Sequence, residues 1–353
     1  MRSTSRLLKP MIKTGPFIKI SILILSSILS FILLEVSYRY VIFGRDSLNY
    51  EKMKSVTPLG LSGLIEPSRD REIVYELKPN LDTYFKMARF KTNSKGLRDK
   101  EYPMIKPKNT IRVAVVGDSF TMSAGVNIED AYHSILEKEL NANCPGKNYE
   151  FINFGVGGYY LSQYWAVIRK KVMDWDPDII LIGFCEYNDF EIPPDKLFDG
   201  AYRVKKRFNP VFFQSFAIRS LKQFFKNLGE KYIDENQRID GNPSFNEEQA
   251  AYMRRIFSTI GTFGVENKIP IVVANVGITP NQHPELDTIV KNSGLYYVDA
   301  TPPFEGKKIS EYSIYPTDNH PNSKANLVFA NVIKEYLEKN RLLNCGMGSG
   351  MKK

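Results

Sequence analysis

From Ile111 onward, short apolar segments alternate with amphipathic ones, and this alternation constrains the fold more than any other feature. Apolar segments with the composition of buried strands cover residues 111–117, 149–156, 178–185, 270–277 and 296–300. Segments with apolar residues at helical spacing cover 129–141, 161–175, 246–267 and 322–340. Strands that alternate with helices form a parallel sheet with helices on both faces. We therefore expect an α/β body with a flavodoxin-like, three-layer α/β/α architecture and a central parallel sheet.

The N-terminal region carries one long apolar run. Residues 17–34 contain Lys19 as their only charged residue, and the run is long enough to cross a bilayer core of roughly 30 Å. Cytoplasmic flanks favour Lys and Arg, and this run is preceded by basic residues alone, Arg2, Arg6, Lys9 and Lys13. This predicts a single-pass membrane anchor with a cytoplasmic N-terminus and a periplasmic or extracellular body. A cleaved signal peptide is the alternative, although the residues after the run are bulky for a cleavage site.

The net charge of +9 is concentrated at the two ends of the chain. Residues 1–45 contain seven Lys or Arg and one Glu, and residues 339–353 contain four Lys or Arg and no acidic residue. The folded body is therefore close to neutral. Because a nucleic-acid interface needs a basic face on the folded domain, we expect no nucleic-acid partner.

The three cysteines, Cys144, Cys185 and Cys345, do not have the spacing of a metal site or of a disulfide framework. Cys185 ends an apolar run and is expected to be a packed strand residue.

Composition divides the chain into segments. We expect a basic cytoplasmic segment (1–16), an anchor with an aromatic interfacial flank (17–43), a polar segment that leads into the body (44–110), the body (111–338) and a disordered tail (339–353). An insert at 190–246 separates the third strand from the longest helix. Apolar residues recur there at helical spacing from Phe213 to Leu228, which fits either a lid over the site or a helix packed on the domain edge.

The first strand runs directly into a serine, in the stretch "VVGDSFT" that contains Ser119. A serine hydroxyl is a weak nucleophile until a base removes its proton, so a histidine is expected nearby. His133 lies inside a predicted helix and is expected to pack there. His283 lies in a loop after the fourth strand that could border the site. His320 precedes the closing helix and has Asp318 two residues before it, which could orient the imidazole ring.

Candidate oxyanion donors follow the next two strands. "NFGVGGYY" (153–160) places glycines after the second strand, and "GFCEYND" places Asn188 after the third. The carboxyl ends of parallel strands meet at one edge of the sheet, so the serine, a glycine, the asparagine and the histidine are all expected there.

This set resembles the SGNH/GDSL hydrolase family, over residues 111–338. The resemblance implies that Ser119 is the nucleophile and His320 the general base. It implies an oxyanion hole formed by the N–H groups of Ser119 and Gly158, with Gly157 less favoured, and by the amide of Asn188. No metal or cofactor is implied. The preceding "TNSKGLRDKEYP" also resembles the lead-in of many bacterial members.

The resemblance departs from the common pattern at one position. Many members have Asp three residues before the histidine, where this chain has Thr317. A triad completed by Asp318 and a Ser–His dyad therefore both remain open.

The function predicted from the sequence is an envelope-anchored serine esterase that acts on an acyl or acetyl ester of a glycan or lipid. The alternatives are an O-acyltransferase that modifies an envelope polysaccharide and a catalytically silent binding or assembly protein. The sequence does not specify the oligomeric state.

Overall fold

The computed structural model describes residues 15–56, 59–186, 189–194, 215–218, 221, 246–278, 283, 285–315 and 318–343. A five-stranded parallel sheet has the order β6-β5-β7-β8-β9. Its strands are β5 (Thr110–Gly117), β6 (Asn148–Asn153), β7 (Ile179–Phe184), β8 (Ile271–Asn275) and β9 (Tyr296–Asp299). Counted along the chain this order is 2-1-3-4-5, that of a flavodoxin-like doubly wound sheet, so the predicted fold class is confirmed.

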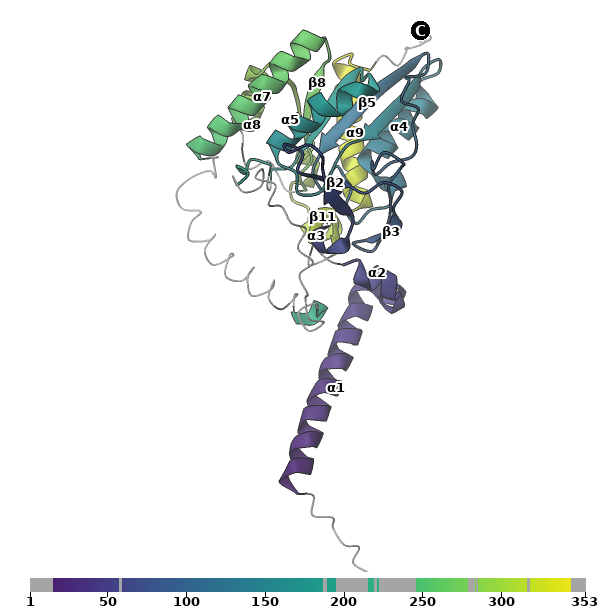
Figure 1. Cartoon of the computed structure of the whole chain (residues 1–353), viewed down its shortest axis with the longest axis vertical. Coiled ribbons are helices and arrows are strands. Elements are labelled where there is room, and N and C mark those ends of the chain that lie inside the picture. The colour runs from purple at the N-terminus through teal and green to yellow at the C-terminus, as the bar shows by residue number, and fades with distance from the viewer. Residues whose placement is uncertain are drawn as a thin grey trace, which may run out of the picture.

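Helices cover both faces of the sheet (Figure 1). On one face lie α4 (Tyr132–Asn143) and α9 (Ser323–Lys339), and on the other lie α5 (Leu161–Lys170), α7 (Glu247–Asn267) and α8 (Glu285–Asn292). Alternate residues of β5 point to opposite sides: Val113 and Val115 pack with α4 and α9, whereas Ala114 and Val116 pack with the other three helices. Burial on both faces explains why the strand sequences are continuously apolar.

Two predicted elements end at least three residues earlier than the sequence suggested. The second strand ends at Asn153 instead of residue 156, because the Asn153 side chain accepts the Gly155 N–H (2.8 Å) and donates to the Thr121 carbonyl (3.0 Å), which turns the chain out of the sheet. The helix predicted to reach residue 175 ends at Lys170 and is followed by the 3-10 helix η3 (Val172–Trp175). Tyr160 precedes this helix as its N-cap.

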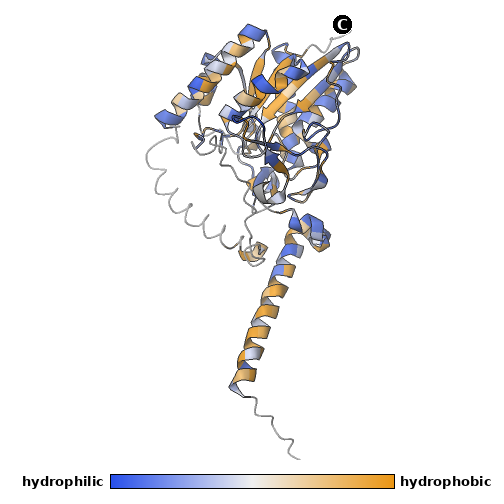
Figure 2. Cartoon of the chain, in the orientation of Figure 1, coloured by the Kyte–Doolittle hydropathy of each residue, from blue (hydrophilic) through white to orange (hydrophobic). Residues whose placement is uncertain are grey.

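The N-terminal helix α1 (Pro16–Phe43) projects away from the body as a single rod with an apolar surface (Figure 2). None of its residues is buried, and it is long and apolar enough to cross a membrane by length and composition. A signal sequence would have the same properties. The 3-10 helix η1 (Gly44–Leu48) and the short helix α2 (Tyr50–Lys54) connect α1 to the body.

The segment that follows α2 packs against the core of the body. After α3 (Leu59–Ser62) it forms two antiparallel pairs, β1 (Ile65–Pro67) with β2 (Tyr75–Leu77) and β3 (Asp82–Phe85) with β4 (Ala88–Lys91). Tyr75, Phe85 and Phe90 are buried in the same cluster as α5 and α7. The pairing of these strands was not predicted from the sequence.

A second unpredicted hairpin precedes α9. Strand β10 (Ser313–Tyr315) pairs with β11 (Asp318–Pro321) in antiparallel orientation, between the 3-10 helices η6 (Pro302–Phe304) and η7 (Ile309–Glu311) and the last helix. The remaining described 3-10 helix, η2 (Ile128–Asp130), precedes α4.

Parts of the chain lie outside the described residues, including most of the insert and residues 344–353. Of the helix predicted between Phe213 and Leu228, only 215–218 and 221 are described. Of the tail predicted to be disordered, residues 339–343 are described, and Leu343 is buried against the core. Cys185 is buried and is not part of a disulfide, whereas Cys144 is disulfide-bonded, which the spacing of the cysteines did not suggest.

Gly117 at the end of β5 provides a test of this packing. A Cβ at Gly117 would lie 2.6 Å from the Thr121 Cβ and 2.7 Å from the Gly183 carbonyl oxygen, so the neighbouring strand would have to move. We expect Gly117→Ala to lower the free energy of unfolding by about 1–3 kcal/mol. Denaturant unfolding of the detergent-solubilised full chain measures this, with Glu248→Ala on the exposed face of α7 as a control. Unchanged stability of Gly117→Ala would contradict the close contact between β5 and β7.

Candidate active site

Ser119 lies in the turn that follows β5. The Asp118 carboxylate accepts the Phe120 N–H (2.8 Å), and the Asp118 carbonyl accepts the Met122 N–H (2.8 Å), which fixes the turn around the serine. Asp118 and Phe120 are buried, whereas Ser119 is half-buried. The strand end therefore presents the serine hydroxyl toward solvent on a backbone held from both sides.

His320 and Asp318 come together with Ser119. The Ser119 Oγ lies 2.8 Å from the His320 Nε2, and the His320 Nδ1 is hydrogen-bonded to an Asp318 carboxylate oxygen. A further carboxylate, Asp118, is 3.3 Å from the Ser119 Oγ, so the imidazole is the nearer partner of the hydroxyl. This is the arrangement of nucleophile, base and orienting carboxylate that acyl transfer by a serine requires.

Strand β11 explains why a carboxylate two residues before the histidine has the right position. Side chains two apart along a strand project to the same side, so Asp318 and His320 face the same space. The Asp318 carboxylate also accepts the His320 backbone N–H (3.1 Å), which ties the two residues together. The geometry of these side chains favours a triad over a Ser–His dyad.

The charge of Asp318 determines which nitrogen of the His320 ring carries the hydrogen. Burial acts to raise the pKa of Asp318, but hydrogen bonding and charge from His320 and the charge of Lys86 outweigh it and hold that pKa well below its usual range. Asp318 is thus a carboxylate, and the His320 Nδ1–H donates to it. The Nε2 is then free to accept the Ser119 hydroxyl proton, an assignment made from the hydrogen-bond network.

The loop after β6 lies beside the serine. A Cβ at Gly157 would be 3.5 Å from the Ser119 Cβ. The Gly157 N–H donates to the Met122 sulfur (3.3 Å), whereas within the described residues the N–H groups of Ser119 and Gly158 donate to no other group. Gly158 has a positive φ of 78°, a conformation that glycine adopts without strain. Both N–H groups are thus available to a substrate oxygen, and Asn188, the third predicted donor, lies outside the described residues.

The other two histidines do not contact the serine in the described structure. His133 is buried in α4, and burial followed by the charge of Arg98 lowers its pKa to about 3, so it is a neutral core residue as predicted. The His283 ring packs against Phe190, with centroids 5.6 Å apart.

Two residues that the sequence analysis did not identify contact Asp318. Lys86, at the turn between β3 and β4, forms an ion pair with the Asp318 carboxylate and places its Nζ 3.1 Å from the His320 Nδ1. The Tyr315 hydroxyl lies 3.4 Å from the same carboxylate. Lys86 is 232 residues away from Asp318 in the chain, and nothing local to "FKMARF" marks it as an active-site residue.

The buried Arg98 side chain holds the turn around Ser119 through hydrogen bonds. This side chain is fully buried, donates to the carbonyls of Met122, Ser123 and Val126, and lies over the Phe90 ring at 4.6 Å. Burial lowers its pKa to about 9, so the guanidinium remains a cation at neutral pH. Arg98, in the segment that leads into the body, thus donates hydrogen bonds to carbonyl oxygens that would otherwise be buried without partners.

The next residue, Asp99, supports the second strand. Its carboxylate accepts the Asn153 N–H (3.0 Å) at the point where β6 ends and the glycine loop begins. Burial raises the pKa of Asp99 to about 7, against the opposing effect of this hydrogen bond. Arg98 and Asp99 therefore give the segment before the body a structural role that the sequence alone did not assign.

Asp189 supports the turn after β7. It is fully buried, and its carboxyl accepts the Tyr164 hydroxyl (2.8 Å) and the Cys185 N–H (2.8 Å). Burial, followed by the nearby charge of Asp118, raises the pKa of Asp189 well above its usual range. The buried Asp189 carboxyl therefore holds a proton more tightly than an exposed aspartate does.

Comparisons with known proteins found no matching family model and no matching curated protein. Solved structures that are similar include a two-domain esterase active on acetylated mannans, at 15% identity and a TM-score of 0.43 over 66% of this chain and 50% of that chain. The chain thus spans about half the length of that protein. An acetylxylan esterase from Geobacillus stearothermophilus is 14% identical with a TM-score of 0.39, over 67% of this chain and 95% of that one. A GDSL-like lipase from Bacteroides thetaiotaomicron is 13% identical with a TM-score of 0.35, over 65% and 88%.

The raised pKa of Asp189 predicts an unusual pH dependence of stability. Because the native state holds this proton more tightly than the unfolded chain, the stabilisation is present below the ordinary Asp range and is lost as the pH rises toward the native-state pKa. Asp189→Asn has no titratable proton at this position. The free energy of unfolding of this variant, relative to that of the wild type, should therefore increase from about pH 5 to about pH 8. Denaturant unfolding at both pH values measures the difference.

Asp189→Leu is the companion variant. It removes the acceptor of the Tyr164 hydroxyl and the Cys185 N–H, so it should destabilise by roughly 1–3 kcal/mol at both pH values. A difference between Asp189→Asn and wild type that does not change with pH would contradict a raised pKa of Asp189.

Proposed function

We propose that this chain is a serine esterase of the SGNH/GDSL type that forms an acyl-enzyme on Ser119. The observation that carries the proposal is the 2.8 Å contact between the Ser119 Oγ and the His320 Nε2, with the other ring nitrogen on a carboxylate. A serine hydroxyl alone is unreactive, and this pairing supplies the base that activates it.

The first half of the reaction transfers the acyl group to the enzyme. His320 removes the Ser119 proton through Nε2 as the Oγ attacks the ester carbonyl, and Asp318 stabilises the imidazolium that forms. The negative charge on the carbonyl oxygen is held by the N–H groups of Ser119 and Gly158, with the amide of Asn188 as a third donor. The tetrahedral intermediate then releases the alcohol, which takes its proton from His320.

The second half releases the acyl group. A water molecule gives a proton to His320 and attacks the acyl-enzyme, which yields the carboxylic acid and restores the Ser119 hydroxyl. A sugar hydroxyl in place of water would transfer the acyl group instead. None of these steps uses a metal or cofactor, because the side chains and backbone amides provide both the proton transfers and the oxyanion donors.

The location of the site suggests the class of substrate. We place α1 in the membrane and the body outside the cytoplasm, because the residues before the anchor are basic and Cys144 is disulfide-bonded, a state that oxidising compartments favour. The Phe43 ring at the end of α1 packs on Tyr315, with centroids 5.4 Å apart, and Tyr315 is next to the catalytic strand. The substrate is therefore an acyl ester, such as an acetyl ester, of a glycan or lipid at the membrane surface.

Active-site labelling and ester hydrolysis test this function. The full chain in detergent should react with a fluorophosphonate at Ser119 and hydrolyse p-nitrophenyl acetate. Ser119→Ala and His320→Ala should lower kcat/KM by roughly 10³-fold or more and abolish labelling. Ser134→Ala, a helix serine outside the site, is the matched control.

Other outcomes would point to the alternatives. Equal rates for wild type and Ser119→Ala, together with no labelling, would favour a silent binding protein. Labelling with acyl transfer to an added oligosaccharide faster than to water would favour an acyltransferase.

A further inference from the structure

Lys86 is the one cation within the described residues that contacts both Asp318 and His320. It lies at the tip of the β3–β4 hairpin, with its Nζ bonded to the Asp318 Oδ2 and 3.1 Å from the His320 Nδ1. Since the Nδ1–H donates to the other Asp318 oxygen, the ammonium acts on the ring through its charge. Only 13% of the Lys86 side chain is exposed, so water screens this charge weakly.

The hairpin turn that presents Lys86 is held by Ser55, which follows α2. The Lys86 N–H donates to the Ser55 carbonyl (3.0 Å), and the Met87 N–H donates to the Ser55 hydroxyl (3.0 Å). Lys86 and Met87 both have positive φ, 47° and 74°, which suits a tight hairpin turn. These two hydrogen bonds to Ser55, in the segment between α1 and the body, hold the backbone of Lys86 in place.

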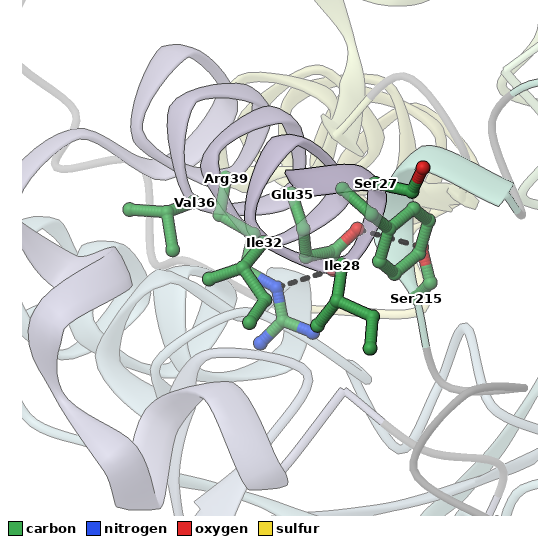
Figure 3. A pocket seen from close by; sticks show the side chains of 8 residues that line it. Ser27, Ile28, Ile32, Glu35, Val36, Arg39 and Ser215 are labelled. Atoms are coloured by element: carbon green, nitrogen blue, oxygen red, sulfur yellow. Dashed lines mark hydrogen bonds and ion pairs between the residues drawn. The ribbon is translucent and has the colours of Figure 1, made fainter. Parts of the chain in front are cut away.

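Asp318 has a second link to the anchor. The Tyr315 hydroxyl lies near its carboxylate, and the Tyr315 ring packs on Phe43 and Phe216, at 5.4 Å and 5.9 Å between centroids. The Phe216 N–H donates to Glu35 of α1 (2.7 Å), and the Ser215 hydroxyl donates to the same carboxylate (2.6 Å). Figure 3 shows Glu35 pointing from α1 toward Ser215, beside an apolar pocket along the helix. Lys86 and Tyr315, which both contact Asp318, are thus held by α1 and by the segment that follows it.

We propose that Lys86 is a positioning residue of the active site, which orients Asp318 and makes the segment after the anchor part of the catalytic unit. This inference rests on the proposed function of Ser119 and His320. Lys86 does not touch the reacting atoms: it acts by holding one carboxylate oxygen so that the other faces the His320 Nδ1–H.

Removal of the ammonium should have two separable effects. Without its donor, the Asp318 carboxylate is held less firmly, so the imidazole is less well aligned with Ser119 and kcat should fall while KM stays unchanged. The charged groups that face His320 are Asp318 from its own strand, Lys86 from the hairpin and Asp118 beside Ser119. Loss of the one positive charge among them favours the imidazolium, which is inactive as a base.

The test compares Lys86→Met, Lys86→Gln and Lys86→Arg in the full chain in detergent. Lys86→Met should lower kcat for p-nitrophenyl acetate roughly 10- to 100-fold. The acid limb of its kcat/KM profile should move to higher pH by about one unit. Lys86→Gln, which keeps a donor without the charge, should show the shift with a smaller loss of kcat. Lys86→Arg should restore much of kcat and the wild-type acid limb.

Lys91→Met is the matched control, because Lys91 lies on the same hairpin, is exposed and pairs only with Asp82 at 3.2 Å within the described residues. An acid limb that does not move in either neutral variant would overturn the proposal. So would a loss of kcat in Lys86→Met that Lys86→Arg does not restore. If the wild type itself is neither labelled nor active, the proposed function fails before Lys86 is tested.

Discussion

The docking of the last helix determines where His320 lies. Asn322 caps α9 through the Lys324 and Ala325 N–H groups, and its amide donates to the carbonyls of Glu311 (2.9 Å) and Ser313 (3.1 Å). Asn326 accepts the Tyr132 N–H (3.1 Å), which joins the start of α9 to the start of α4. The hairpin that carries His320 is therefore tied to the start of α9, which is itself joined to α4, and His320 lies within hydrogen-bond distance of Ser119.

Support for the serine comes from buried polar groups instead of from apolar packing alone. Arg98 donates hydrogen bonds to three carbonyls of the turn after Ser119. The Asn153 side chain joins that turn to the glycine loop through its hydrogen bonds with Thr121 and Gly155. Buried polar groups with good partners specify one arrangement, because an alternative would leave them without hydrogen bonds. In the proposed mechanism these two loops present N–H groups to one oxygen. Holding them at a fixed separation before substrate arrives is the condition for electrostatic stabilisation of an oxyanion.

Sequence reasoning reached the sheet and the serine because both depend on local patterns. A buried parallel strand must be apolar throughout, and a polar residue directly after it must lie at the sheet edge. The hairpin β10–β11 gave no such signal, because "DNHP" lacks the alternation of a strand, so the reason for the two-residue spacing of Asp318 and His320 emerged only from the structure. Sequence reasoning could not identify Lys86 for a different reason. Its contact with Asp318 joins residues 232 positions apart in the chain, and a lysine in a polar segment has the same local pattern as any solvated lysine.

The junction between α1 and the body argues against a passive tether. A helix that served only as a tether would need a linker and no contact with the residues around Asp318. Here Ser55 holds the hairpin of Lys86, and Phe43 packs on the tyrosine that neighbours Asp318. Strand β11, which carries Asp318 and His320, lies at the end of the body that faces α1 (Figure 1). A change in how α1 meets the body therefore changes the surroundings of Asp318 directly, without any need for a signal to cross the core.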